Sequence, residues 1–331
     1  MGTRVSKFIV ALLWCATSAF ASVGFQKTAI PDPHGKQIDV GIWYPSSAKA
    51  SPHSLGLLSQ DVAVDGDVAG KKLPFILISH GAYGSLASHY DTAIALAQAG
   101  FVVAALTHTG DNSDDQSYLG NRIDLIDRPR QAKLVLDWML DSWPGHDHLD
   151  QGRVGIFGFS LGGFTSLVEI GGTPELRRMA LLCSTHRDAP ECAFIKRTHG
   201  DQLDPNPPNP EWAHDARIRA AVIAAPAVSF LFGPGDLKRV SIPVQLWRAE
   251  DDTQAPDATN SGVVRKELPV HPEEHIVPGQ DHYVFLAPCS AALATAVPEI
   301  CHDTGDFDRA AFHRSFNQSV VSFFRKELRA R

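Results

Sequence analysis

The chain has 331 residues, of which 44% are hydrophobic and 20% are charged, so it can bury a sizeable core and has an ordinary globular composition. The formal net charge of −7 disfavours nucleic acid and anionic membrane surfaces as partners. One large domain, or one domain with an insertion, fits this length best.

The first residues have the pattern of a secretory signal peptide. Arg4 and Lys7 precede the apolar run Phe8–Trp14, and small residues lead to Ala19-Phe20-Ala21, which fits an A-x-A cleavage site. The apolar run is too short to span a bilayer, so no stable membrane anchor is expected. We predict a signal peptide over 1–21, a mature chain over 22–331, and a protein that is periplasmic or secreted.

The cysteines are consistent with export. A lipoprotein would use Cys15 as its anchor, but bulky Trp14 stands where a small residue is expected. Cleavage removes Cys15 and two positive charges, which moves the net charge from −7 to about −9. An even number of cysteines then remains in an oxidising compartment, where disulfides form readily. They are Cys183, Cys192, Cys289 and Cys301. Three connectivities are possible, and Cys183–Cys192 with Cys289–Cys301 closes the shortest loops; free buried thiols are the alternative.

The first predicted elements of the mature chain are two strands. Gly24–Ile30 and Gln37–Tyr44 alternate in polarity, and Asp32-Pro33-His34-Gly35 is a typical turn between them. From Pro45 onwards we expect a loop.

Buried strands then alternate with helices. We predict strands at 74–79, 101–106 and 153–157, and helices at 85–99 and 127–143. Such continuous apolar strands are typical of a parallel sheet that is buried on both faces, with right-handed crossover connections. The sequence therefore predicts an α/β fold with a mostly parallel central sheet flanked by helices.

A serine motif follows the last of these strands. Gly158-Phe159-Ser160-Leu161-Gly162-Gly163 lies between an apolar strand and a helix-compatible segment, which predicts a serine nucleophile on a strand-to-helix elbow. Glycines flank the serine because a Cβ there would collide with the neighbouring strand and helix. The strand–turn–helix context gives this short pattern its weight.

The regular alternation stops after the elbow helix. Residues 171–216 contain two cysteines, several charges and a proline-rich run at 204–210, so we predict a cap-like insertion at the sheet edge. Strands at 218–224, 244–247 and 274–277 resume the sheet, and an amphipathic helix at 308–329 closes the chain.

A serine nucleophile needs a histidine base and an acid that orients the histidine, and in this class of fold they follow in the order Ser, acid, His. Asp251 and Asp252 compete for the acid position in the loop after strand 241–247. His282 follows the last strand and is the predicted base; His275 falls within that strand, and His302 lies beyond the cysteine loop.

The oxyanion of the tetrahedral intermediate needs two backbone donors. Leu161 supplies one at the start of the elbow helix, and Ala82 in the glycine-rich turn 79–84 is the expected second donor. Tyr83, Phe159 and Tyr283 flank these predicted residues, and we expect them to contact the substrate.

Several of these segments together resemble the bacterial predicted dienelactone hydrolases and platelet-activating-factor acetylhydrolases of the α/β-hydrolase superfamily. The resemblance is carried by Ser79-His80-Gly81-Ala82, by 99–105 with His108 and Asp111 after it, by the elbow, by the acid loop and by Asp281-His282. It implies a triad of Ser160, Asp252 and His282, with Asp252 preferred because the D-x-x-x-P arrangement ending at Pro256 resembles the acid loop of such hydrolases.

The sequence thus predicts an exported serine hydrolase that cleaves small-molecule or lipid carboxylic esters through an acyl-enzyme. An acetylhydrolase-like phospholipase and a non-catalytic binding protein of the same fold are the alternatives. No cofactor or metal is expected, since no nucleotide-binding motif or C-x-x-C pair occurs and Gly145-His146-Asp147-His148 is more typical of a solvated loop.

Overall fold

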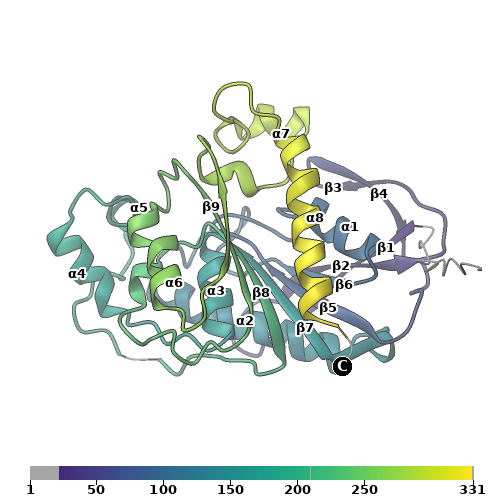
Figure 1. The fold of residues 1–331 in the computed structure, drawn as a ribbon, viewed down its shortest axis with the longest axis horizontal. Coiled ribbons are helices and arrows are strands. Elements are labelled where there is room, and N and C mark those ends of the chain that lie inside the picture. The colour runs from purple at the N-terminus through teal and green to yellow at the C-terminus, as the bar shows by residue number, and fades with distance from the viewer. Residues whose placement is uncertain (1–21, 209, 330–331) are drawn as a thin grey trace, which may run out of the picture.

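The computed structural model describes residues 22–208 and 210–329 (Figure 1). The predicted signal peptide and Cys15 lie outside the described residues. No described helix is both long enough and apolar enough to cross a membrane.

One sheet of ten strands forms the centre of the molecule, in the order β10-β9-β8-β7-β5-β6-β2-β1-β4-β3. The strands are β1 (Ser22–Ile30), β2 (Ile38–Ser46), β3 (Ser51–Leu55), β4 (Leu58–Val64), β5 (Leu73–Ser79), β6 (Val102–Leu106), β7 (Leu149–Phe159), β8 (Ile218–Ala224), β9 (Val244–Ala249) and β10 (Glu273–Val277). The six strands from β10 to β6 are parallel, whereas β2 runs antiparallel to both β6 and β1. The predicted fold class, α/β with a mostly parallel sheet, is therefore confirmed.

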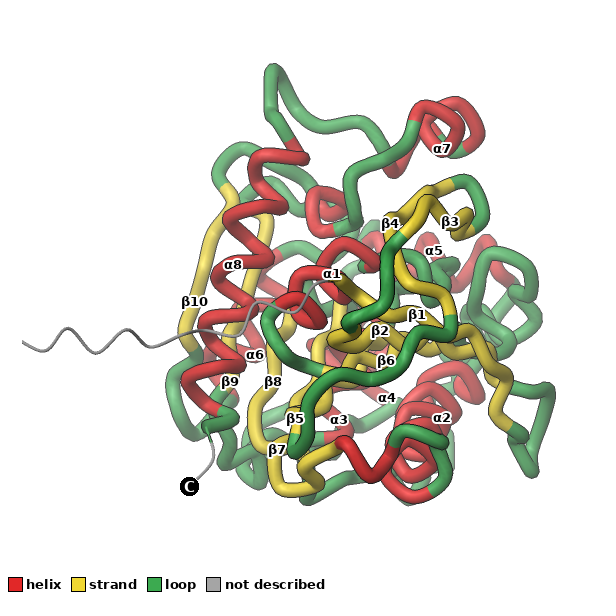
Figure 2. Tube along the Cα trace, turned by 90° about the vertical axis from the view of Figure 1, so that its right-hand side faces the viewer, coloured by secondary structure: helices red, strands yellow, loops and turns green. Residues whose placement is uncertain are grey.

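Helices cover both faces of this sheet (Figure 2). They are α1 (Tyr90–Gln98), α2 (Arg122–Asp141), α3 (Leu161–Glu169), α4 (Arg177–Thr185), α5 (Pro190–Thr198), α6 (Ser261–Glu267), α7 (Ala291–Ala296) and α8 (Arg309–Glu327). In β5, Phe75 and Leu77 pack with the core beneath α2 and α3, whereas Ile76 and Ile78 pack with the core beneath α1 and α8. This alternation explains the continuous apolar run of β5, because successive side chains of a strand enter opposite layers.

The expectation of a loop after Pro45 is wrong. Strand β2 continues to Ser46, and β3 and β4 form an antiparallel hairpin across the turn at Gly56-Leu57. Pro45 has no N–H to donate, but its carbonyl accepts the N–H of Ala69 at 2.8 Å. Most side chains of β3 are exposed, so this hairpin lacks the apolar pattern that marks the buried strands.

The helix predicted from residue 85 begins later, at Tyr90. The N–H of Ser85 donates to the hydroxyl of Ser88 at 3.0 Å, and the N–H of Ala87 donates to the hydroxyl of Ser85 at 3.2 Å. These serine side chains bind backbone groups locally, which favours a turn over a helix. Conversely, α2 begins at Arg122, five residues before the predicted start, and this earlier turn contributes to the candidate site.

Helices α4 and α5 lie in the inserted segment, residues 171–216, between α3 and β8. In Figure 1 they stand to one side of the sheet, beside α6. They cover the carboxyl ends of the parallel strands rather than a lateral edge, since α5 and Ser160 line the same cavity and β7 lies inside the sheet.

Candidate active site

Ser160 lies on a sharp turn between β7 and α3. Its backbone has φ +54° and ψ −118°, a strained conformation for a residue with a Cβ. The turn requires small neighbours, because a Cβ added to Gly158 would lie 2.1 Å from the carbonyl oxygen of Gly162, and one added to Gly162 would lie 2.0 Å from the carbonyl oxygen of Ser79. This is the geometry expected of a nucleophile elbow.

A chain of hydrogen bonds connects the three residues predicted to act together. The Oγ of Ser160 lies 2.8 Å from Nε2 of His282, and Nδ1 of His282 lies 2.8 Å from Oδ2 of Asp252. All three side chains are buried. A carboxylate on Nδ1 places the ring proton there, which leaves Nε2 as the acceptor that faces the serine hydroxyl.

The acid loop distinguishes the two adjacent aspartates. The Oδ1 atom of Asp252 accepts the N–H groups of Gln254 at 3.0 Å and of Ala255 at 2.7 Å, so the carboxylate is fixed while Oδ2 faces His282. Asp251 is exposed, and its carboxylate has no hydrogen-bond partner among the described residues. The geometry therefore favours Asp252 over Asp251 as the partner of the histidine.

Asp281 joins the acid loop to the base loop. Its Oδ1 accepts the N–H groups of Thr253 and His282, each at 2.7 Å, and its Oδ2 accepts the Thr253 hydroxyl. Burial alone would raise the pKa of Asp281, but these donors outweigh burial and lower it. An ionised Asp281 thus fixes the backbone next to His282.

The two predicted oxyanion donors lie beside the serine. Ala82 and Leu161 line the cavity that contains Ser160, and within 22–208 and 210–329 neither backbone N–H has a hydrogen-bond acceptor. A Cβ added to Gly81 would approach Cβ of Ser160 to 3.0 Å, so the turn after β5 packs directly against the elbow. Two free N–H groups beside a serine hydroxyl could bind the oxygen of a polarised carbonyl.

The cavity at Ser160 has a volume of about 190 Å³. The predicted substrate-contacting residues Tyr83, Phe159 and Tyr283 all line it. The remaining walls come from the inserted segment, the start of α2 and loops after β8 and β9, through Met179, Pro190, Glu191, Phe194, Ile195, Arg197, Gln202, Asp124, Leu125, Ala227, Val228 and Gln254. Sequence reasoning did not identify this second set.

One feature of the sequence could have indicated part of this second set of cavity-lining residues. Asp124 and Arg128 are spaced like the apolar residues of α2, yet both are charged and both are buried. Burial and the neighbouring charge of Asp111 raise the pKa of Asp124 well above the usual carboxyl range. Charges on the apolar face of a helix are rare enough to indicate a buried network.

The structure contains the two expected disulfides. Cys183–Cys192 joins α4 to α5 within the inserted segment, and Cys289–Cys301 closes the loop that follows His282. The first joins two helices that line the cavity, and the second lies close in sequence to the predicted base.

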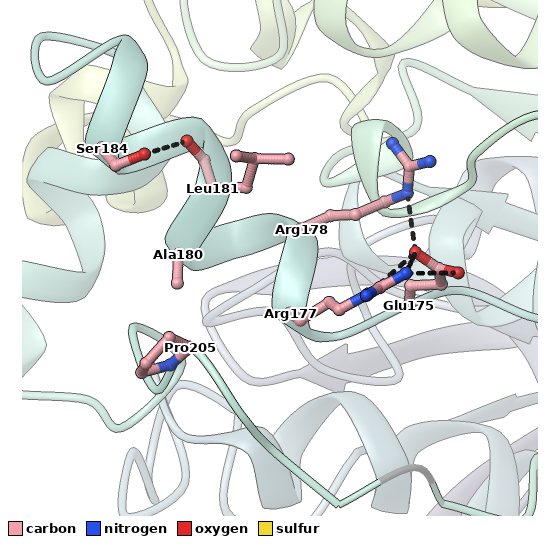
Figure 3. A pocket seen from close by; sticks show the side chains of 7 residues that line it. All are labelled: Glu175, Arg177, Arg178, Ala180, Leu181, Ser184 and Pro205. Atoms are coloured by element: carbon pink, nitrogen blue, oxygen red, sulfur yellow. Dashed lines mark hydrogen bonds and ion pairs between the residues drawn. The ribbon is translucent and has the colours of Figure 1, made fainter.

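A larger groove of about 510 Å³ lies over α4 and shares no lining residue with the Ser160 cavity (Figure 3). Its Glu175 carboxylate binds both Arg177 and Arg178, and the Ser184 hydroxyl donates to the carbonyl of Leu181. No histidine lines this groove, so it lacks a base that could activate Ser184.

Nothing in the described part of the chain resembles a metal site, since no group of three His, Cys, Asp or Glu side chains converges there. His146 and His148 form a short 3-10 turn, and their Nδ1 atoms bind the carbonyls of Trp143 and Gly70.

The strand order and the position of the elbow define the α/β-hydrolase fold. A solved structure with a similar fold is a ferulic acid esterase from Streptomyces cinnamoneus, with a TM-score of 0.62 and 19% sequence identity over 96% of this chain and 92% of that chain. No protein-family model and no curated protein matches the sequence. At this identity, the likeness establishes the fold.

Proposed function

We propose that the chain is an exported serine hydrolase that cleaves carboxylic esters through an acyl-enzyme. The observation that carries the proposal is the pair of 2.8 Å contacts from His282, one to Ser160 and one to Asp252. The α/β-hydrolase fold supports it, and so does the similarity of that fold to a ferulic acid esterase.

In the proposed reaction, Oγ of Ser160 attacks the ester carbonyl while Nε2 of His282 takes the hydroxyl proton. The N–H groups of Ala82 and Leu161 donate to the oxyanion, and Asp252 stabilises the imidazolium. His282 then gives the proton to the leaving alcohol. Water next attacks the acyl group on Ser160, with His282 again as the base. The bond between Oγ and the acyl carbon then breaks, His282 returns the proton to Oγ, and the acid leaves.

The cavity indicates the size and character of the proposed substrate. Its volume of about 190 Å³ accommodates a small acyl group, and four aromatic side chains line it, those of Tyr83, Phe159, Phe194 and Tyr283. Short aliphatic and hydroxycinnamate esters are therefore the first substrates to test. The second class takes its chemistry from the ferulic acid esterase of similar fold. The resemblance to acetylhydrolases adds short acyl esters of lipids, and no cofactor is required.

Export is part of the proposal. The segment 1–21 has a signal-peptide pattern, and the disulfides Cys183–Cys192 and Cys289–Cys301 suit an oxidising compartment.

A series of p-nitrophenyl esters of increasing acyl length, together with methyl ferulate, tests the function on the mature chain 22–331. We expect hydrolysis that is inhibited by a fluorophosphonate, with kcat/KM highest for short or aromatic acyl groups. Hydrolysis that fluorophosphonate does not affect would contradict a serine mechanism. A chain that neither hydrolyses any ester nor reacts with fluorophosphonate would instead be a binding protein.

A further inference from the structure

A buried ion pair fixes the turn that carries Ala82. From α2, Nη2 of Arg128 donates to the carbonyl of His80, and Nη1 donates to Oδ2 of Asp111. Arg128 is 1% exposed and Asp111 is 0% exposed. A buried charge pair of this kind is rarely needed for stability alone, because apolar residues of similar volume often serve as well.

Asp111 of this ion pair also binds Tyr83, the residue that follows Ala82. The Oδ1 atom of Asp111 accepts the N–H of Tyr83 at 2.9 Å. Tyr83 has φ +62°, a left-handed conformation that a bulky side chain seldom adopts and that persists only where surrounding contacts hold it. His80 and Tyr83, which bracket Gly81 and Ala82, are thus both bound to one ion pair.

Two buried histidines beside the ion pair carry no charge. Burial, together with the positive charge of Arg128, lowers the pKa of His80 and His108 well below the usual histidine range, so both rings are neutral. The Nε2 atom of His80 accepts the N–H of His108 at 3.0 Å, and Gln131 from α2 binds Nδ1 of His108 at 3.0 Å. Helix α2 therefore anchors the loops after both β5 and β6.

We propose that Arg128 and Asp111 are positioning residues that act through the backbone of His80 and Tyr83 to hold the N–H of Ala82 as an oxyanion donor. This inference rests on the proposed function. Neither residue lines the cavity, so neither contacts substrate, and their effect falls on the transition state rather than on substrate binding.

Kinetics of Arg128→Gln and Asp111→Asn on one p-nitrophenyl ester test the proposal. We expect kcat to fall on the order of 10²-fold with KM changed less than about threefold, because the loss of one oxyanion donor acts on the transition state. Affinity for a trifluoromethyl ketone, whose adduct with Ser160 carries an oxyanion, should fall by the same factor as kcat/KM. A merely structural role would not produce that proportionality.

Arg130→Gln is the matched control. Arg130 lies on the same helix and binds Asp32 through both Nη atoms at 2.7 and 2.8 Å, but it has no contact with the Ala82 turn. We expect it to lower the melting temperature while leaving kcat and ketone affinity unchanged.

The proposal is wrong if folded Arg128→Gln or Asp111→Asn retains wild-type kcat, or if Arg130→Gln loses kcat equally. Should Arg128→Gln fail to fold, Asp111→Asn decides, since Asn keeps an acceptor for Tyr83 and removes only the charge. Ser160→Ala distinguishes failure of the proposed function from failure of the positioning role. Full activity in that variant would refute the proposed function, whereas an inactive Ser160→Ala beside a fully active Asp111→Asn would refute only the positioning role.

Discussion

The cavity has two walls of different construction. The wall formed by the sheet loops has buried polar groups that are fixed by short hydrogen bonds, such as those of Asp252 and His282. The wall formed by the inserted segment packs Leu176, Met179 and Ile195 into the core. Its partly exposed ion pairs run from Arg122 to Asp201 and Asp204, and its own disulfide joins α4 to α5. Exposed ion pairs contribute little stability, about 0–1 kcal/mol each.

This difference separates two tasks. The proposed nucleophile, acid and base lie on turns at the ends of strands, whereas part of the cavity lining, including Phe194, lies on the inserted segment. Substitutions on each wall should therefore separate effects on turnover from effects on substrate preference.

The largest effect is expected at the sheet wall from Ser160→Ala. The substitution removes the proposed nucleophile, so kcat should fall on the order of 10⁴-fold or more without loss of the fold. Steady-state kinetics and circular dichroism measure the two effects. Near wild-type turnover would show that Ser160 does not carry the reaction.

The acid loop should give the next largest effect. Asp252→Asn should lower kcat on the order of 10³- to 10⁴-fold, because the amide cannot hold His282 in the required tautomer. Asp251→Asn, at the exposed neighbour, is the control and should change kcat less than about twofold. If Asp251→Asn lowers kcat more than Asp252→Asn does, then Asp251 and not Asp252 is the acid that orients His282.

Substrate selectivity should change on substitution in the wall formed by the inserted segment. Phe194 on α5 packs edge-to-face on Tyr83, with ring centroids 6.1 Å apart, and it lines the cavity. Phe194→Ala should shift the ratio of kcat/KM between aromatic and acetyl esters about tenfold or more, while kcat on the acetyl ester changes little. Leu181→Ala, on the same segment but 60% exposed and outside the cavity lining, should leave that ratio unchanged.

The two disulfides extend the comparison to stability. Loss of Cys289–Cys301, which closes a 12-residue separation next to the base loop, should lower the free energy of unfolding by about 3 kcal/mol and weaken activity. Replacing Cys183 and Cys192 by serine should affect ester preference more than global stability, because that disulfide joins α4 and α5 within the inserted segment. Urea unfolding and the ester series distinguish these outcomes, and equal effects of both disulfides would contradict a division of tasks.

The smallest expected effect concerns Glu169 on α3, whose carboxylate oxygens are buried and have no partner in 22–208 and 210–329. Burial and the nearby charge of Asp215 raise the pKa of Glu169 well above the usual carboxyl range. The folded chain therefore keeps a proton that the unfolded chain loses, so stability falls as the pH rises above that range.

Glu169→Gln should remove this dependence, so that it is more stable than the wild type at pH 8 and equal to it near pH 4. Thermal melts across this range measure the difference, with Glu211→Gln at an exposed position as the control. A gain that is independent of pH would mean that ionisation of Glu169 is not responsible.

The two walls also differed in how far the sequence predicted them. Strands and helices around the elbow follow from periodicity, because burial on both faces imposes a continuous apolar run on β5, β6 and β7. We predicted the serine, the acid and the histidine from their order along the chain. The fold brings Ser160 and Asp252 within hydrogen-bond distance of His282. Their catalytic role remains the proposal made above.

The inserted segment carries no comparable pattern. The position of α5 over Ser160 depends on tertiary contacts, such as the bond from Asn260 to Glu191 at 3.2 Å, which join residues far apart in the chain. The role of Arg128 was hidden for the same reason, since its partners His80 and Asp111 lie on two other loops. The polar hairpin β3–β4 was missed because an exposed hairpin does not need an apolar pattern.

Fluorophosphonate labelling of the mature protein, followed by peptide mapping, tests the central claim most directly. We expect one adduct, on Ser160, that forms in step with loss of esterase activity and is strongly slowed in His282→Ala. An adduct on another residue, or full ester hydrolysis by completely labelled protein, would contradict it.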